Sequence, residues 1–155
     1  MKVFVVTGTP GTGKTRFARR LARKGHMMYV DVARLIREKG LYMRYDRRLR
    51  SYVADVSRVV RHLQRFIAVQ KKSLVIDSHL SHYLPPRLVT RCYVTVCNLK
   101  TLRRRLQRRK YPQAKIRENL DAEILQICLL EAIQRRHHVF VVNTSHKRPK
   151  VMRRD

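Results

Sequence analysis

A glycine-rich stretch near the N-terminus has the residue types and the spacing of a phosphate cradle. Residues 8–15 read GTPGTGKT, which fits the pattern G-x-x-x-x-G-K-[ST] in full. Glycines let such a loop curl so that successive backbone N–H groups point at phosphate oxygens, and the helix that follows adds its positive dipole end. We expect Lys14 to reach the β- and γ-phosphates of a nucleotide and Thr15 to hold Mg²⁺. The other candidate nucleotide-binding residues here are Gly8, Pro10, Gly11, Thr12, Gly13 and Arg16.

A second set of chemically capable side chains follows the apolar residues 74–76. Asp77 comes first, and His79 and His82 follow it in the sequence DSHLSH. One reading is a zinc site made from all three, but zinc ligands at such short spacing usually need a further ligand, and no paired cysteine lies nearby. The preferred reading depends on the phosphate cradle, since such a loop needs a carboxylate at the end of a neighbouring strand. We therefore expect Asp77 to hold the water shell of Mg²⁺.

The two histidines carry different expectations. His79 lies two residues beyond Asp77, so it is expected close to the phosphates, able to orient a water molecule or a helix cap. His82 is interpreted as a structural histidine with satisfied hydrogen bonds.

Hydrophobic periodicity predicts the strands and helices that would position these residues. The runs that read as strands are residues 3–6, 27–32, 74–77, 92–96 and 139–143. The stretches that read as helices are residues 15–24, 52–69, 99–109 and 116–133.

Strands that are apolar throughout and alternate with helices are typical of a parallel sheet covered on both faces. The segment between the second and third strands, residues 32–72, is longer than a simple crossover needs. It predicts an inserted helical subdomain beside the sheet. With 155 residues and no internal repeat or Gly/Ser spacer, the chain is expected to form a single α/β domain.

Composition excludes several classes of protein. The chain is 44% hydrophobic, which argues against a disordered tail. It contains no apolar run long enough to span a membrane, and its first residues read as a strand and not as a signal peptide. Its three cysteines, at positions 92, 97 and 128, form no CxxC pair. Reduced, buried thiols in an intracellular compartment are the expected reading.

The charge of the chain is extreme. Lys and Arg number 37 against 10 Asp and Glu, which gives a formal net charge of +27. Such a field attracts polyphosphates, and RNA is the obvious large partner. Solvated ion-pair networks are the alternative, and they are disfavoured because acidic partners are too few.

Four segments together resemble a known family. GTPGTGKT, LxREKGLYxxYD, DSHLSH and LxxRLxxRxYxxxKIxENLxAEI occur in order along the chain. They resemble the adenylate-kinase-like NTPases of ribosome biogenesis, which include archaeal proteins and the eukaryotic adenylate kinase isoenzyme six, or coilin-interacting nuclear ATPase protein. The resemblance extends from Val3 to about Thr144. It implies a P-loop fold with a five-stranded parallel sheet, a helical insert that binds a nucleoside monophosphate, and a short lid.

The resemblance also implies roles for individual residues. The insert would span about residues 31–54, and within it Arg37 matches the arginine that contacts the AMP phosphate. The lid would span about residues 103–113, and Arg105 and Arg109 match its catalytic, nucleotide-binding arginines. Asp77 and His79 match the metal-site aspartate and the functional histidine. Tyr111, Lys115, Asn119 and Glu123 match the pattern that follows the lid.

The function implied is that of an enzyme: a Mg²⁺-dependent adenylate kinase with ATPase activity, which uses ATP and AMP or another nucleoside monophosphate and acts in small ribosomal subunit maturation. One alternative is a nucleotide-switched assembly factor that binds RNA or ribosomal protein with little kinase turnover. Another is a basic RNA-binding module without useful turnover. The cytoplasm is the expected compartment, or the nucleus in a eukaryote, and no membrane is involved.

The charge departs from the family pattern. Members are often acidic or near neutral and act with a basic small-subunit ribosomal protein. A chain of charge +27 repels such a partner over a Debye length of roughly 8 Å. Either local acidic residues make that contact, or rRNA or a pre-ribosomal particle takes the place of the protein partner.

Overall fold

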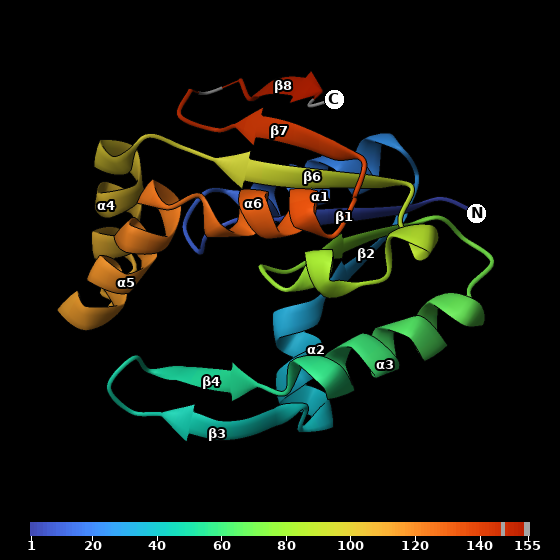
Figure 1. The fold of residues 1–155 in the computed structure, drawn as a ribbon, viewed down its shortest axis with the longest axis horizontal. Helices are drawn as coiled ribbons and strands as arrows, with labels where there is room; N and C mark the ends of the chain where they lie inside the picture. Colours follow the sequence, from blue (N-terminus) through green and yellow to red (C-terminus); the bar gives the residue numbers. More distant parts are fainter. Residues whose placement is uncertain (147, 154–155) are drawn as a thin grey trace.

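The structure, a computed structural model, describes residues 1–146 and 148–153. Strands and helices alternate along most of the chain (Figure 1). The strands are β1 (Val3–Thr7), β2 (Met28–Asp31), β3 (Tyr42–Asp46), β4 (Ser51–Ala54), β5 (Leu74–Asp77), β6 (Arg91–Val96), β7 (Val139–Asn143) and β8 (Lys150–Arg153). The helices are α1 (Lys14–Lys24), α2 (Val32–Lys39), α3 (Val56–Ala68), α4 (Leu99–Arg108), α5 (Gln113–Ile124) and α6 (Ile127–Gln134), with 3-10 turns η1 (Ser81–Tyr83) and η2 (Pro86–Leu88). No helix in this part of the chain has the length and apolarity that crossing a bilayer requires.

The main sheet has the strand order β2-β5-β1-β6-β7-β8. The first five of these strands are parallel, as the apolar runs predicted. β8 pairs antiparallel with β7 and adds an edge that the sequence analysis did not anticipate. Parallel strands have their carboxyl ends together. Thr7 at the end of β1 and Asp77 at the end of β5 therefore both lie at the carboxyl ends of the strands.

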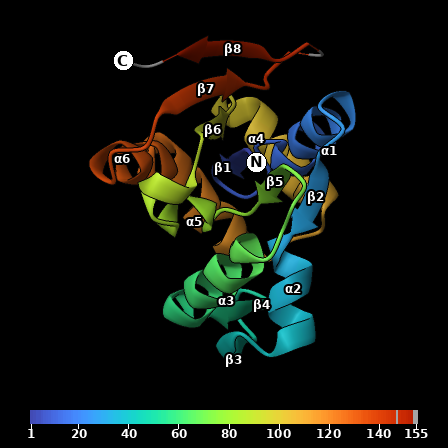
Figure 2. The ribbon, with the colours of Figure 1, turned by 90° about the vertical axis from the view of Figure 1, so that its right-hand side faces the viewer.

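Helices cover both faces of the sheet, as predicted. Alternate residues of each strand face opposite sides, so Val5 belongs to one hydrophobic cluster and Val6 to the other. On the Val5 side the sheet packs against α2, α3 and α6, whereas α1 lies on the Val6 side (Figure 2). A third cluster joins α4 to α5 through Leu106, Leu120 and their neighbours.

The inserted subdomain contains helices, as predicted, but it also contains two strands. Residues 42–54 form an antiparallel hairpin, β3–β4, and the predicted helix 52–69 begins only at Val56. The physical reasons are local. Tyr45 and Tyr52 pair directly across the hairpin, and aromatic cross-strand pairs stabilise strands. Asp55 then accepts a hydrogen bond from Arg58 N at 3.0 Å, which caps α3 at its observed start.

The predicted helix 116–133 is wrong as a single element. The chain breaks it into α5 and α6 at Leu125 and Gln126, where Gln126 adopts a left-handed φ of 51°. No glycine or proline marks this break. Tertiary packing requires it, because α5 places Leu120 against α4 while α6 turns to place Leu129 against the sheet.

Candidate functional site

The glycine-rich stretch forms a phosphate loop, residues 8–15, between β1 and the first turn of α1. Its three glycines, Gly8, Gly11 and Gly13, all have a positive φ. Gly8 has a φ of 133°, and a Cβ there would lie 2.4 Å from the Thr95 carbonyl oxygen. Gly13 has a φ of 89° and precedes the first residue of α1. The loop therefore has the backbone geometry that presents its N–H groups and the N-terminus of α1 to an anion.

Hydroxyl groups of threonines form hydrogen bonds with the phosphate loop, and two of these threonines, Thr95 and Thr144, were not predicted from the sequence. Thr12 Oγ1 donates to the Thr9 carbonyl at 2.6 Å and lies 2.7 Å from Thr95 Oγ1 on β6. Thr144, just after β7, donates from its hydroxyl to the Thr12 carbonyl at 2.5 Å. Nothing in the local sequence marks Thr95 or Thr144, because they reach the loop only through the order of strands in the sheet.

Lys14 folds back over the phosphate loop. Its Nζ donates to the Thr9 carbonyl at 2.9 Å. Burial lowers the pKa of Lys14 to about 8, and the nearby charge of Asp77 offsets part of this effect. Lys14 is therefore still mostly protonated at pH 7 but loses its proton at a lower pH than an ordinary lysine, and an anion in the loop would favour its charged form.

Asp77 ends β5 as a buried carboxylate between two strands. It is in register with Val6 of β1 on one side and with Asp31 of β2 on the other. Tyr29, also on β2, donates from its hydroxyl to Asp77 Oδ2 at 2.8 Å. Burial and, to a smaller extent, this hydrogen bond raise the pKa of Tyr29 to about 12. The phenol therefore stays protonated and remains a donor. Tyr29 was not among the site residues predicted from the sequence.

The donor set suits Mg²⁺ better than zinc. Among the described residues there is no group of three His, Cys, Asp or Glu side chains that could hold a metal by themselves. Mg²⁺ requires less from the protein, since one carboxylate and a hydroxyl together with nucleotide phosphates are sufficient. Asp77 supplies the carboxylate, and Thr15 lies exposed in the first turn of α1. The zinc reading also fails because His82 is engaged elsewhere.

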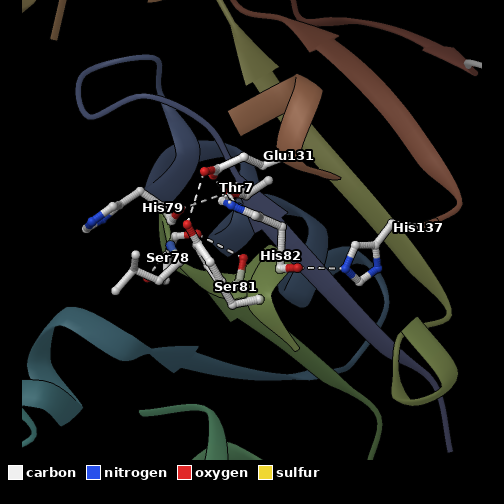
Figure 3. A network of polar contacts seen from close by, with 9 residues as sticks. Thr7, Ser78, His79, Ser81, His82, Glu131 and His137 are labelled. Carbon is white, nitrogen blue, oxygen red and sulfur yellow. Dashed lines mark hydrogen bonds and ion pairs between the residues drawn. The ribbon is translucent and has the colours of Figure 1, made fainter. Parts of the chain in front are cut away.

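His82 is a satisfied structural histidine, as predicted. Its ring is buried, with Thr7 Oγ1 2.7 Å from Nδ1 and Glu131 Oε2 2.8 Å from Nε2 (Figure 3). Burial lowers the pKa of His82 although Glu131 opposes the shift. A neutral ring has one N–H, so Nε2–H donates to Glu131 and Nδ1 accepts from the Thr7 hydroxyl. His137 donates from Nε2 to the His82 carbonyl at 2.7 Å, which completes a link from β1 to α6 and β7.

The ring of His79 lies apart from this network, although the His79 carbonyl oxygen is 3.2 Å from Thr7 Oγ1. Its ring points away from His82 in Figure 3, and the residue is exposed. Two effects lower the pKa of His79 to about 4: desolvation is the larger, and the positive charge of Lys14 is the next largest. The imidazole is therefore neutral at pH 7. A neutral ring near Lys14 has a free nitrogen to accept a proton or a hydrogen bond.

The arginines singled out by the resemblance lie in different settings. Arg105 is half-buried on α4, and its guanidinium donates to the Thr144 carbonyl at 2.7 Å and to the Gly11 carbonyl at 3.4 Å. Arg109 is exposed at the end of α4, 5.9 Å from the ring centre of Tyr111. Arg37 is exposed in the last turn of α2. Arg105 is therefore held against the phosphate loop, whereas Arg109 and Arg37 face solvent.

The residues that follow α4 hold α5 against the sheet. Glu123 Oε1 accepts a hydrogen bond from Cys97 N at 3.0 Å, just beyond β6. Asn119 is buried and donates to the Lys115 carbonyl at 2.7 Å, and Lys115 Nζ lies 4.1 Å from the centre of the Tyr111 ring. These contacts position the segment that carries Arg109.

The three cysteines are free thiols; Cys92 and Cys97 are buried as expected, whereas Cys128 is only partly buried. Burial raises the pKa of Cys92 to about 12 and that of Cys97 to about 11. Burial also raises the pKa of Cys128. None of the three has the depressed pKa of a reactive thiol.

Comparisons with known proteins agree with this geometry. A family model described as "AAA domain" matches residues 5–126. A Methanosarcina barkeri protein named "Putative adenylate kinase" is 36% identical over 144 residues, which cover 92% of this chain and 76% of that protein. A Dictyostelium discoideum "Adenylate kinase isoenzyme 6 homolog" is 35% identical over 128 residues, with coverage of 83% and 72%. A solved shikimate kinase from Acinetobacter baumannii shares the fold, with a TM-score of 0.66 at 15% identity and coverage of 94% and 85%.

Proposed function

The chain belongs to the adenylate-kinase-like family of P-loop proteins, and from this premise we propose that it transfers the γ-phosphoryl group of ATP to AMP, with ATP hydrolysis as an accompanying activity. The observation that supports this most directly is Lys14 inside the phosphate loop close to the buried carboxylate of Asp77. A kinase needs a lysine and a carboxylate placed in this way, because most of the catalysis of phosphoryl transfer comes from positioning the phosphates and neutralising their charge.

Each residue of the site has a task in this proposal. The loop N–H groups and Lys14 bind the β- and γ-phosphates, and Thr15 and Asp77 would hold Mg²⁺. The metal, when bound, neutralises charge on the phosphates. Tyr29 keeps the Asp77 carboxylate oriented. His79 orients the incoming group, and Arg105 and Arg109 neutralise charge that builds up during transfer.

The second substrate is assigned to the insert. Arg37 is the proposed contact to the AMP phosphate, and its exposure on α2 leaves the guanidinium free to meet an anion. Residues 103–113 are the proposed lid, which would bring Arg109 over the nucleotide and exclude water.

The test compares two arginines of the same helix. Arg37→Ala should abolish phosphorylation of AMP while hydrolysis of ATP without AMP continues. Arg34→Ala is the matched control, because Arg34 is paired with Glu38 at 2.6 Å and has no assigned substrate. Formation of ADP from AMP would be followed by chromatography. If Arg37→Ala retained full AMP phosphorylation, the assignment of the AMP subsite would be wrong.

A second candidate function is favoured by the charge of +27. In it, the chain is a nucleotide-switched factor of small ribosomal subunit maturation that binds rRNA or a pre-ribosomal particle, and hydrolysis resets its cycle. Asp77→Ala and His79→Ala should then trap the protein on RNA in the presence of ATP, as measured by co-sedimentation. Release at the normal rate with hydrolysis blocked would contradict it. A chain that binds RNA but has no turnover in either assay would instead be a plain RNA-binding module.

A further inference from the structure

The hairpin β3–β4 stands apart from the main sheet. Figures 1 and 2 show it at the end of the molecule opposite β7 and β8, connected to the body through α2 and α3. Its two strands form a separate sheet. Two-stranded hairpins are marginally stable in water, so this one depends on its own cross-strand contacts and on Tyr42, which packs against the main core.

An aromatic row follows one side of the hairpin outward from the core. The ring centres of Tyr42 and Tyr52 are 4.6 Å apart, and those of Tyr52 and Tyr45 are 5.1 Å apart. Tyr52 is 42% exposed and Tyr45 is 48% exposed, and neighbouring Met43 is 68% exposed. Contiguous exposed apolar patches mark sites of interaction, whereas single exposed apolar residues do not.

The turn of the hairpin carries arginines that lack acidic partners. Four arginines, at positions 44, 47, 48 and 50, accompany a single aspartate in residues 42–54. Asp46 uses one oxygen to accept from Leu49 N at 2.9 Å and has the other 3.7 Å from Arg44 Nη1. Between described residues, Arg47, Arg48 and Arg50 form no ion pair. They are exposed, and the hydrogen bond to Asp46 gives the turn that carries them a defined shape.

We propose that this hairpin is a binding platform for single-stranded RNA, in which bases stack on Tyr45 and Tyr52 and the arginines of the turn contact the phosphates. Unpaired bases stack on aromatic side chains, and a neighbouring basic surface follows the backbone. An acidic protein segment would satisfy the arginines but would not use two exposed aromatic faces. The inference rests on the RNA partner of the second proposed function. The hairpin lies within the insert proposed to bind AMP, but the platform uses Tyr45, Tyr52 and the turn arginines and not Arg37.

The test measures the affinity of the full chain for a labelled oligouridylate of about 12 nucleotides, a length within the range of single-stranded sites. Fluorescence anisotropy is recorded with increasing salt. Tyr45→Ala/Tyr52→Ala should weaken binding about tenfold or more, because each stacked base is lost. Tyr45→Phe/Tyr52→Phe keeps the rings and should bind like the unmodified chain. ATP hydrolysis without AMP and the melting temperature check that the variants are folded.

A charge-matched pair separates the platform from the general positive field. Arg47→Gln/Arg48→Gln should lower the salt dependence of binding by about two phosphate contacts, and Arg20→Gln/Arg23→Gln on α1 should leave it nearly unchanged. Equal losses in the two variants would overturn the proposal, since binding would then depend on net charge alone. Normal RNA binding by Tyr45→Ala/Tyr52→Ala would also overturn the proposal.

Two further outcomes assign the hairpin to another ligand. A higher KM for AMP in Tyr45→Ala/Tyr52→Ala, with RNA binding intact, would make the aromatic row a subsite for the nucleotide base. Competition by polyglutamate as strong as that by oligouridylate would make the hairpin a site for acidic protein. If the unmodified chain bound no RNA, the second proposed function would fail together with this inference, whereas intact binding in every hairpin variant would refute the inference alone.

Discussion

At the scale of single residues, the structure places a tyrosine behind the carboxylate proposed to serve the metal. Tyr29 and Asp77 come from neighbouring strands, β2 and β5, and the Tyr29 hydroxyl fixes one oxygen of the carboxylate. Mutating a group that orients a metal-site ligand typically costs about 10-fold to 100-fold in metal affinity or activity. Tyr29 is therefore a positioning residue in the proposed reaction.

Tyr29→Phe should reduce kcat/KM for MgATP by about 10-fold to 100-fold, because Asp77 loses the hydrogen bond that orients it. The loss should shrink as Mg²⁺ is raised, which a purely structural defect would not do. Initial rates over a range of Mg²⁺ concentrations measure this. Tyr52→Phe is a control that removes a hydroxyl remote from Asp77, and an equal loss in both variants would count against the assignment.

Lys14 should make ATP binding depend on pH. In the free protein its pKa is lowered to about 8, whereas bound phosphates favour the ammonium and raise the pKa. Below pH 8 both states are protonated, so the affinity is constant with respect to this group. Above pH 8 binding must take up a proton, and the affinity falls by up to about tenfold per pH unit. Calorimetry in buffers of different ionisation heat measures the uptake, and Lys14→Arg, which stays charged, should abolish it.

At the scale of elements, the ends of helices were set by contacts that the periodicity did not reveal. The apolar spacing predicted α1 and α4 to within a residue or two at each end. It extended the third helix back through Tyr52, because valine and tyrosine there fit a helical face as well as a strand. Pairing of β3 with β4 decided between the two structures, and Asp55 then fixed where α3 begins.

Asp55→Ala should lower the free energy of unfolding by about 1 kcal/mol, because the first turn of α3 loses its side-chain cap. Urea denaturation followed by circular dichroism measures the change. Asp55→Asn retains an oxygen at the same position and should cost much less. If both variants lost the same stability, the negative charge of Asp55 would matter and not the hydrogen bond to Arg58 N.

At the scale of the whole molecule, the positive charge is largely unneutralised. Between described residues, arginine and carboxylate pairs within 4.0 Å are Arg34–Glu38 and Arg44–Asp46. Both are exposed enough at the arginine to contribute little. This agrees with the expectation that acidic residues are too few for ion-pair networks.

The melting temperature should therefore rise as salt increases, in contrast to a protein held by surface ion pairs. Between about 0.01 M and 1 M potassium chloride the Debye length falls from about 30 Å to about 3 Å, which screens the self-repulsion of the +27 chain. Differential scanning fluorimetry measures this. A small amount of polyphosphate at low salt should have the same effect, and a melting temperature that falls with salt would contradict the explanation.

The sequence by itself determined the parts that depend on local chemistry. The phosphate loop follows from glycines and a lysine at fixed spacing, and the five parallel strands follow from apolar runs that are buried on both faces. Asp77 could be selected because a strand end beside such a loop needs a carboxylate. The resemblance selected Arg37, Arg105 and Arg109, which composition could not separate from the other basic residues.

Only the tertiary structure decided which side chains reach this site from distant parts of the chain. Tyr29, Thr95 and Thr144 contact Asp77 or the phosphate loop because β2, β6 and β7 take particular places in the sheet. The split between α5 and α6 has the same origin, since each half packs on a different neighbour. Such contacts join residues far apart in sequence, and no pattern within a single segment encodes them.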